Sequence, residues 1–148
     1  MNSKKLIPVI LSAATALTVF ASEKKITKAE VPAAVLDSFS KSFPGAHAKR
    51  YTTGQENGKA VFEVESIRDK RTLDVSFTTM GDILQSEEGI ETGELPPAVT
   101  EAVHKMFPQA TVKRAEKMTR GSKSYFELAL RNAPKKEVLF APDGKLAK

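Results

Sequence analysis

Closely spaced carboxylates are the side chains of this chain that could do chemistry together. Glu63 and Glu65 lie two residues apart where apolar and polar residues alternate, so both face the same side of a predicted strand. Glu127 holds the place of Glu63 in a second, similar segment. Carboxylates that converge can bind calcium or serve as acid and base. The simpler interpretation, which we prefer, is an exposed sheet face where each glutamate has a cationic cross-strand neighbour.

Other catalytic and metal-binding patterns are not evident in the sequence. The chain has two histidines, His47 and His104, and no cysteine, whereas a metal site needs three or four convergent ligands. Neither histidine has another three or four residues away, so both are expected at the surface. The glycines of residues 54–58 do not open a helix, as a phosphate-binding loop would, and no hydrolase nucleophile motif occurs. We therefore expect no enzyme activity, metal site or cofactor.

The sequence repeats itself with an offset of 64 residues. Nine of the twenty residues in VPAAVLDSFSKSFPGAHAKR (31–50) are identical in LPPAVTEAVHKMFPQATVKR (95–114). VFEV (61–64) and YFEL (125–128) keep this offset, which shortens to 63 between VSFTTMG (75–81) and VLFAPDG (138–144). Such a period indicates a duplicated structural unit. We expect repeat 1 at residues 22–85, a linker at 86–93 (SEEGIETG) and repeat 2 at 94–148.

Each repeat begins with a predicted amphipathic helix. Pro32 and Pro96 suit a first helical turn, and Pro44 and Pro108 end the helices because the residue before proline leaves the α region. Four strand-like segments follow, at 46–53, 60–67, 72–78 and 83–85, and again at 111–118, 123–131, 136–141 and 145–147. The predicted fold class is α+β, with two tandem α-β-β-β-β repeats, each an antiparallel four-stranded meander covered on one face by a helix. The predicted core residues are Phe43, Phe62, Val75, Phe77, Phe107, Phe126, Val138 and Phe140.

The sheet face opposite the helices is the expected place for function. Strand parity puts polar side chains there, and tyrosine and arginine are typical anchors of protein interfaces. The candidate binding residues are Glu63, Glu65, Asp74, Tyr125, Glu127 and Arg131, with Ser76 and Glu137 on the same face.

The first 21 residues have the pattern of a secretory signal peptide. Lys4 and Lys5 precede an uncharged apolar run at residues 6–20, and Ala21 offers a cleavage site. The run is about 15 residues, against the roughly 20 of a spanning helix, and it contains Pro8, so we expect cleavage and no stable membrane insertion. The protein is therefore predicted to be periplasmic or secreted.

Charge and composition limit the classes of partner that the protein is expected to bind. The net charge is +5, and losing the two lysines of the signal peptide leaves +3. Lysines and arginines are dispersed among acidic residues and tryptophan is absent, so no nucleic-acid partner is expected. Without cysteine, stability must come from burial rather than disulfides.

The order of motifs in both repeats resembles the PepSY-like family. The motifs are V/L-P-x-A-V, F-P-x-A and K-R, followed by F-E-V/L and by V-x-F with a glycine after it. That family is also described as β-lactamase-inhibitor-protein-like, and the resemblance covers the mature chain as two tandem copies. It implies exported bacterial proteins of helix-on-sheet repeats, with an inhibitory or binding role and no established catalytic residues. This chain lacks the disulfides of the β-lactamase inhibitors, and no inhibitory contact can be transferred to a residue here.

Together these patterns predict an exported, non-enzymatic binding protein that recognises a protein or peptide partner in the cell envelope through its exposed sheet face. Inhibition of an envelope or secreted enzyme is the sharpest form of this hypothesis. The alternative is a small-ligand or metal-binding periplasmic protein, with Glu63, Glu65 and Glu127 as the metal-binding residues.

Overall fold

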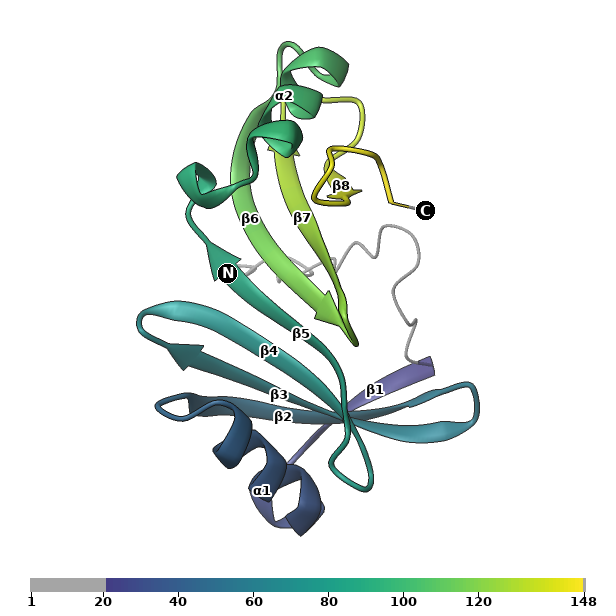
Figure 1. Ribbon diagram of the computed structural model, residues 1–148. Helices are drawn as coiled ribbons and strands as arrows, with labels where there is room; N and C mark the ends of the chain where they lie inside the picture. Colours follow the sequence, from purple (N-terminus) through teal and green to yellow (C-terminus); the bar gives the residue numbers. More distant parts are fainter. Residues whose placement is uncertain (1–20, 148) are drawn as a thin grey trace, which may run out of the picture.

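The computed structural model describes residues 21–147, so the expected signal peptide, apart from Ala21, lies outside the described residues. Eight antiparallel strands form one sheet in chain order, with a helix before β2 and another before β6 (Figure 1). The strands are β1 (Ala21–Ile26), β2 (His47–Glu56), β3 (Lys59–Arg68), β4 (Arg71–Thr78), β5 (Ile83–Ile90), β6 (Thr111–Arg120), β7 (Lys123–Arg131) and β8 (Glu137–Phe140).

The helices are α1 (Ala33–Ser42) and α2 (Pro97–Met106), close to where the flanking prolines place them. Each buries two residues of one stripe, Val35 and Phe39 in α1 and Val99 and Val103 in α2. A short 3-10 turn precedes each helix, η1 (Lys28–Glu30) and η2 (Thr92–Glu94). In both turns the last glutamate accepts a hydrogen bond from the backbone N–H three residues earlier, at 2.7 Å in η1 and 2.8 Å in η2.

Both helices cover the same face of the sheet. The register follows one face from Leu73 in β4 through Glu88 in β5 and Lys117 in β6 to Phe126 in β7. Leu73 packs in the core under α1 and Phe126 in the core under α2, so the two cores share this face. Figure 1 shows α1 and α2 on the outer sides of a sheet that bends along β5. The other face, which neither helix covers, lies on the inside of the bend.

Two separate hydrophobic clusters hold the helices to the sheet. The first contains Val35, Phe39, Val75 and Phe77. The rings of Phe39 and Phe77 meet edge-on, with their centroids 6.4 Å apart. The second, under α2, contains Val99, Val103, Val138 and Phe140, with Val103 at the place of Phe39. The predicted core is confirmed for the buried Val75, Phe77, Phe126, Val138 and Phe140, whereas Phe43, Phe62 and Phe107 pack half-buried at the margins. The halves are joined by backbone pairing of β5 with β4 and β6.

The α+β class and the helix-covered antiparallel sheet are confirmed, but three elements differ from the expectation. The stretch 86–93, expected as a linker, is the second half of β5 followed by the start of η2. β1 precedes α1 and was not expected, and the last expected strand, 145–147, contributes only a bridge from Leu146 to Phe140. Backbone pairing on both sides makes β5 a strand despite its polar sequence. Each half therefore has the order β-α-β-β-β.

Two glycines mark equivalent close approaches in the two halves. Gly81 has φ +85°, and a Cβ there would lie 2.4 Å from the carbonyl oxygen of Ala34 in α1. Gly144 has φ +81°, and its Cβ would lie 2.4 Å from the carbonyl oxygen of Ala98 in α2. Only glycine meets both the positive φ and the lack of space.

Candidate binding face

The face without helices carries most of the polar groups singled out from the sequence. Cross-strand pairing places Glu65, Asp74 and Glu87 directly side by side on β3, β4 and β5. The same row continues through Met118 to Tyr125. We call this surface the uncovered face; its central residues are Arg50, Thr52, Val61, Glu63, Glu65, Asp74, Ser76, Gln85, Glu87, Arg114, Glu116, Met118, Tyr125, Glu127, Glu137 and Leu139.

Side chains on the uncovered face are more buried than those of an open sheet surface. Thr52 and Val61 are each 3% exposed and Met118 is 2% exposed, although no helix lies over them. The inside of a bent sheet brings neighbouring side chains together. Polar groups there are therefore partly withdrawn from water.

Six carboxylates occupy the middle of this face, and we call them the acidic strip: Glu63, Glu65, Asp74, Glu87, Glu116 and Glu127. Burial raises the pKa of Glu63 to about 7, and the negative charges of neighbouring carboxylates add to the shift. Burial likewise raises the pKa of Glu87 to about 7 and that of Asp74 to about 6. The pKa of Glu127 is raised by burial and by the charge of Glu116. Desolvation is the first cause in each case, because it disfavours the charged form.

Two arginines form ion pairs with carboxylates of the strip. Arg50 pairs with Glu65 through an Nε–Oε1 hydrogen bond of 2.6 Å. Arg114 stands 64 residues later; its Nε lies 3.5 Å from Oε2 of Glu116 and its Nη2 lies 4.0 Å from Oε1 of Glu137. A register shift of the strand pairing comes directly before each arginine, between residues 48 and 50 and between 112 and 114. Such bulges turn a side chain toward a new face, and here both deliver an arginine to the uncovered face.

Four carboxylates of the strip form no ion pair in the described chain, although Arg50 and Arg114 are near enough for their charges to act on three of them. Within residues 21–147 no ion pair involves Glu63, Asp74, Glu87 or Glu127. Glu63 has the Thr52 hydroxyl at 3.5 Å, and Glu87 accepts a hydrogen bond from the Gln85 amide at 2.6 Å. One carboxylate oxygen of Glu137, beside the strip, is buried with no hydrogen-bond partner in the described part of the chain. The strip is thus a half-buried surface with an excess of negative charge.

The predicted site residues all lie on the uncovered face, but not in one cluster. Glu63, Glu65 and Asp74 gather on β3 and β4, and Tyr125 and Glu127 follow on β7. Arg131 is exposed at the end of β7, opposite Thr111 and outside the strip. Their role in binding stays a prediction.

Sequence reasoning missed Glu87, Glu116, Arg50 and Arg114. Glu87 was assigned to a linker, and the parity of the arginines depends on bulges that the sequence does not display. The repeat relates two of them, because Arg114 matches Arg50 at the offset of 64, so placing either arginine predicts the place of the other.

The glutamates of the alternative metal site do not all lie together. Glu63 and Glu127 lie on β3 and β7, four strand steps apart, which is roughly 19 Å along the sheet. Among residues 21–147 no group of three histidine, cysteine, aspartate or glutamate side chains is arranged to hold a metal ion. His47 and His104 are exposed, as expected.

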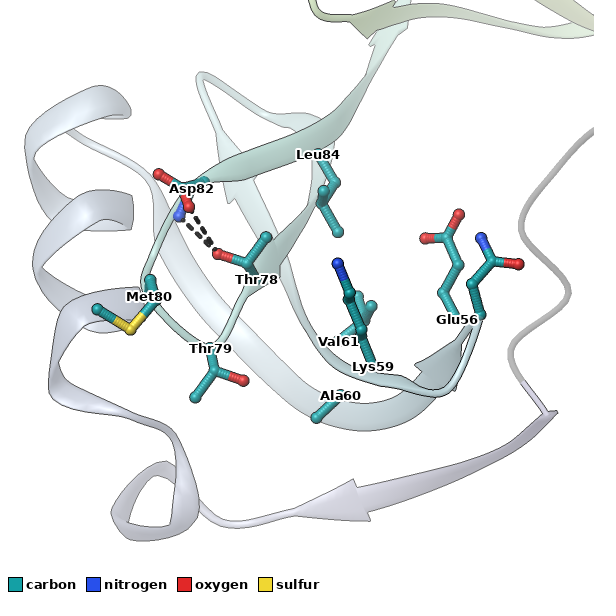
Figure 2. A pocket seen from close by; sticks show the side chains of 10 residues that line it. Glu56, Lys59, Ala60, Val61, Thr78, Thr79, Met80, Asp82 and Leu84 are labelled. Atoms are coloured by element: carbon teal, nitrogen blue, oxygen red, sulfur yellow. Dashed lines mark hydrogen bonds between the residues drawn. The ribbon is translucent and has the colours of Figure 1, made fainter.

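A pocket of about 670 Å³ opens beside the strip at the N-terminal end of β3 (Figure 2). Val61, Met80 and Leu84 are among its apolar lining residues, and Glu56, Lys59 and Asp82 are its charged ones. Figure 2 shows the Lys59 side chain in the middle of the pocket, pointing toward Leu84. Leu84 lies where the pairing of β4 and β5 shifts register. Asp82 is held by Thr78, whose hydroxyl accepts from the Asp82 N–H and donates to its carboxylate, both at 3.1 Å.

Neither α1, α2 nor any other helix in residues 21–147 has the length and apolar composition that crossing a bilayer requires.

Comparison with known proteins finds the fold but no family. No protein-family model matches the chain, and no curated protein matches it. A BLIP-like (β-lactamase-inhibitor-protein-like) protein from Bacteroides fragilis is 22% identical, with a TM-score of 0.60 over 78% of this chain and 82% of that chain. The chain has a BLIP-like fold.

Two further solved structures agree with this fold. A DUF2874 family protein from Bacteroides uniformis is 18% identical, with a TM-score of 0.64 over 79% of this chain and 86% of that chain. A candidate periplasmic protein from Bacteroides eggerthii is 17% identical, with a TM-score of 0.65 over 80% of this chain and 86% of that chain. The periplasmic description of that neighbour agrees with the location expected from the N-terminal sequence.

Proposed function

We propose that this is an exported, non-enzymatic binding protein that recognises a protein or peptide partner in the periplasm through its uncovered face. The observation that carries the proposal is the acidic strip. Half-buried carboxylates that outnumber the cations beside them weaken a fold, because desolvation and mutual repulsion both act against them. A partner that supplies positive charge would turn this cost into binding free energy.

The shape of the face supports a macromolecular partner. Both helices lie on the opposite side, so the uncovered face from β2 to β8 is free of other elements of the described chain (Figure 1). Tyr125 lies at the end of the central row and adds the kind of side chain that anchors protein interfaces.

The comparisons and the sequence support the proposal in different ways. A BLIP-like neighbour suggests a fold suited to holding another protein, and the PepSY-like motifs with their 64-residue offset suggest two copies of one ancestral binding unit. Inhibition of an envelope or secreted enzyme is the sharpest form of the proposal.

Capture from a periplasmic extract tests this function. The immobilised protein should retain a partner, and replacing Glu63, Tyr125 and Arg131 together should abolish that capture. Any enzyme activity of the captured partner should fall when the protein is added. The matched control replaces Asp37, Glu101 and Lys105, which are exposed on α1 and α2. Equal loss of the partner in both triple variants, or retention in the first, would show that another face binds.

A further inference from the structure

The pocket beside the acidic strip has apolar lining residues on an otherwise polar face. Val61 forms its buried part at 3% exposure, and Met80 stands at its edge with 78% exposure. Figure 2 shows Met80 on the turn between β4 and β5, on the side of the pocket opposite the β2–β3 hairpin. An exposed methionine at a cavity is a typical contact for a partner, because its flexible thioether adapts to the shape that it meets.

The fold itself does not require this pocket. In the second half, Tyr125 stands at the position of Val61, with the offset of 64. At the offset of 63 found in this part of the chain, Asp143 replaces Met80 and Ala147 replaces Leu84. The second half thus keeps the glycine turn, but it has other residues at these three positions, and only the bridge of Leu146 to Phe140 follows its turn where β5 follows the first. The apolar lining is therefore specific to the turn between β4 and β5.

The pocket and the acidic strip lie in line along β3. Val61, Glu63 and Glu65 are alternate residues of one strand, so their side chains share the uncovered face. Alternate residues in a strand are about 6.6 Å apart. A partner segment in an extended conformation presents its own alternate side chains at the same spacing. One such segment can fill the pocket and lie over the strip at once.

Charge complementarity identifies the rest of that segment. Next to Glu63 and Glu65 lie Asp74 and Glu87, and Arg50 is the one cation paired within this group in the described chain. The pocket itself has one cation, Lys59, opposite Glu56 in the β2–β3 register, and a second carboxylate, Asp82. The larger excess of negative charge begins one step beyond the pocket, at Glu63.

Building on the proposed function, we propose that the partner presents an extended segment with one bulky apolar side chain followed by basic residues at alternate positions. The apolar side chain enters the pocket over Val61 and Leu84, with Met80 at its edge. The next two alternate side chains, lysine or arginine, lie over Glu63 and then over Glu65, Asp74 and Glu87. Apolar burial gives the anchor, and the cations replace the missing counter-charges of the strip.

Synthetic peptides test this assignment on the protein purified from the periplasm. The probe is acetyl-Gly-Phe-Ser-Lys-Ser-Arg-Gly-amide, measured by calorimetry at about 20 mM ionic strength, where charges are weakly screened. We expect a dissociation constant below about 1 mM. Replacing the phenylalanine with serine, or both basic residues with glutamate, should weaken binding at least about tenfold. Placing the basic residues one position nearer the phenylalanine should weaken it similarly, because they then face away from the strip.

Protein variants separate the two parts of the contact. Met80→Ala should weaken the probe about three- to tenfold through lost apolar contact, whereas Met106→Ala, an exposed methionine on α2, should leave it unchanged. Glu63→Gln with Glu87→Gln should weaken it at least about tenfold and reduce its salt dependence, whereas Glu101→Gln should not. Thermal unfolding of each variant confirms that it is folded.

Three results would overturn the inference: no binding of the probe, equal binding of the glutamate peptide, or equal effects of Met80→Ala and Met106→Ala. Its failure can be told from failure of the proposed function. If the captured periplasmic partner is lost when Glu63, Tyr125 and Arg131 are replaced but not with Met80→Ala, the uncovered face still binds and only the segment assignment is wrong.

Discussion

Asp74 lies directly opposite Glu87 in the ladder of β4 and β5, on the face that neither helix covers. Like charges placed opposite each other destabilise a sheet. Both carboxylates are largely buried, and burial raises the pKa of each, to about 6 for Asp74 and about 7 for Glu87. The fold therefore retains a local arrangement that works against its own stability.

Glu87→Gln should make the protein more stable at pH 8. The amide keeps the shape of the side chain and its contact with Gln85, but removes a half-buried negative charge. We expect the free energy of unfolding to rise by about 1–2 kcal/mol, since one pKa unit corresponds to about 1.4 kcal/mol and part of the shift is screened. Urea unfolding measures this, with Glu101→Gln on α2 as the control of near-zero effect. A less stable Glu87→Gln protein would contradict the electrostatic account of the strip.

The stability of the unmodified protein should fall as the pH rises from 5 to 8. Glu63 and Glu87, whose pKa values are about 7 in the folded chain against 4.5 unperturbed, bind more protons when folded than when unfolded. Their contribution is fully present below about pH 4.5 and is lost as the pH rises through 7, on the order of 2 kcal/mol in total. Glu30 and Glu94 have lowered pKa values and act in the opposite direction at more acidic pH.

Urea midpoints between pH 5 and pH 8 check this dependence. The double variant Glu63→Gln, Glu87→Gln should show a flatter profile than the unmodified protein. Arg50 and the carboxylates Glu23, Glu65, Asp74, Glu116 and Glu127 also act on these two groups, so a residual slope is expected. Equal slopes in both proteins would place the titration elsewhere.

Arg50→Ala should destabilise the protein at pH 8 by about 0.5–1 kcal/mol. Arg50 is half-exposed and hydrogen-bonds Glu65, so its contribution is that of a surface pair. Without it, Glu65 faces Asp74 with no cation. Arg114→Ala should cost less, because its ion contacts are longer, at 3.5 and 4.0 Å. Adding Glu65→Gln to Arg50→Ala should restore the lost stability in urea unfolding, and failure to do so would show that Arg50 acts through packing alone.

The sequence predicts the parts of this fold whose side chains alternate between core and solvent. β3 and β4 could be placed because Val64, Val75 and Phe77 repeat with period two beneath a helix bracketed by prolines. β1 and most of β5 could not, because ASEKKI and ILQSEEGI contain few apolar residues and are ordered mainly by backbone pairing with neighbours distant in the chain.

The candidate site could be predicted only where the ladder is regular. Glu63, Glu65 and Glu127 follow from parity on β3 and β7, whereas Glu87 belongs to a strand that was assigned to a linker. Arg50 and Arg114 reach the uncovered face through bulges, which are features of pairing between strands rather than of local composition. The sequence therefore predicts the acidic groups better than their counter-charges.

Gly81→Ala and Gly144→Ala should each destabilise the fold by about 2 kcal/mol or more. In both cases the new Cβ meets a helix carbonyl oxygen at 2.4 Å and the residue has a positive φ, so strain and overlap add. Gly45→Ala is the matched control, since Gly45 has φ +80° but nothing within 4 Å of its Cβ, and it should cost only about 1 kcal/mol.

Urea unfolding at constant m-value measures the three glycine variants. Similar losses for Gly81→Ala and Gly144→Ala, both larger than that of Gly45→Ala, would show that the two halves hold their helices by the same contact. A loss confined to one of them would mean that the second turn has acquired a different role. In that case the equivalence of the halves would not extend beyond the order of their elements.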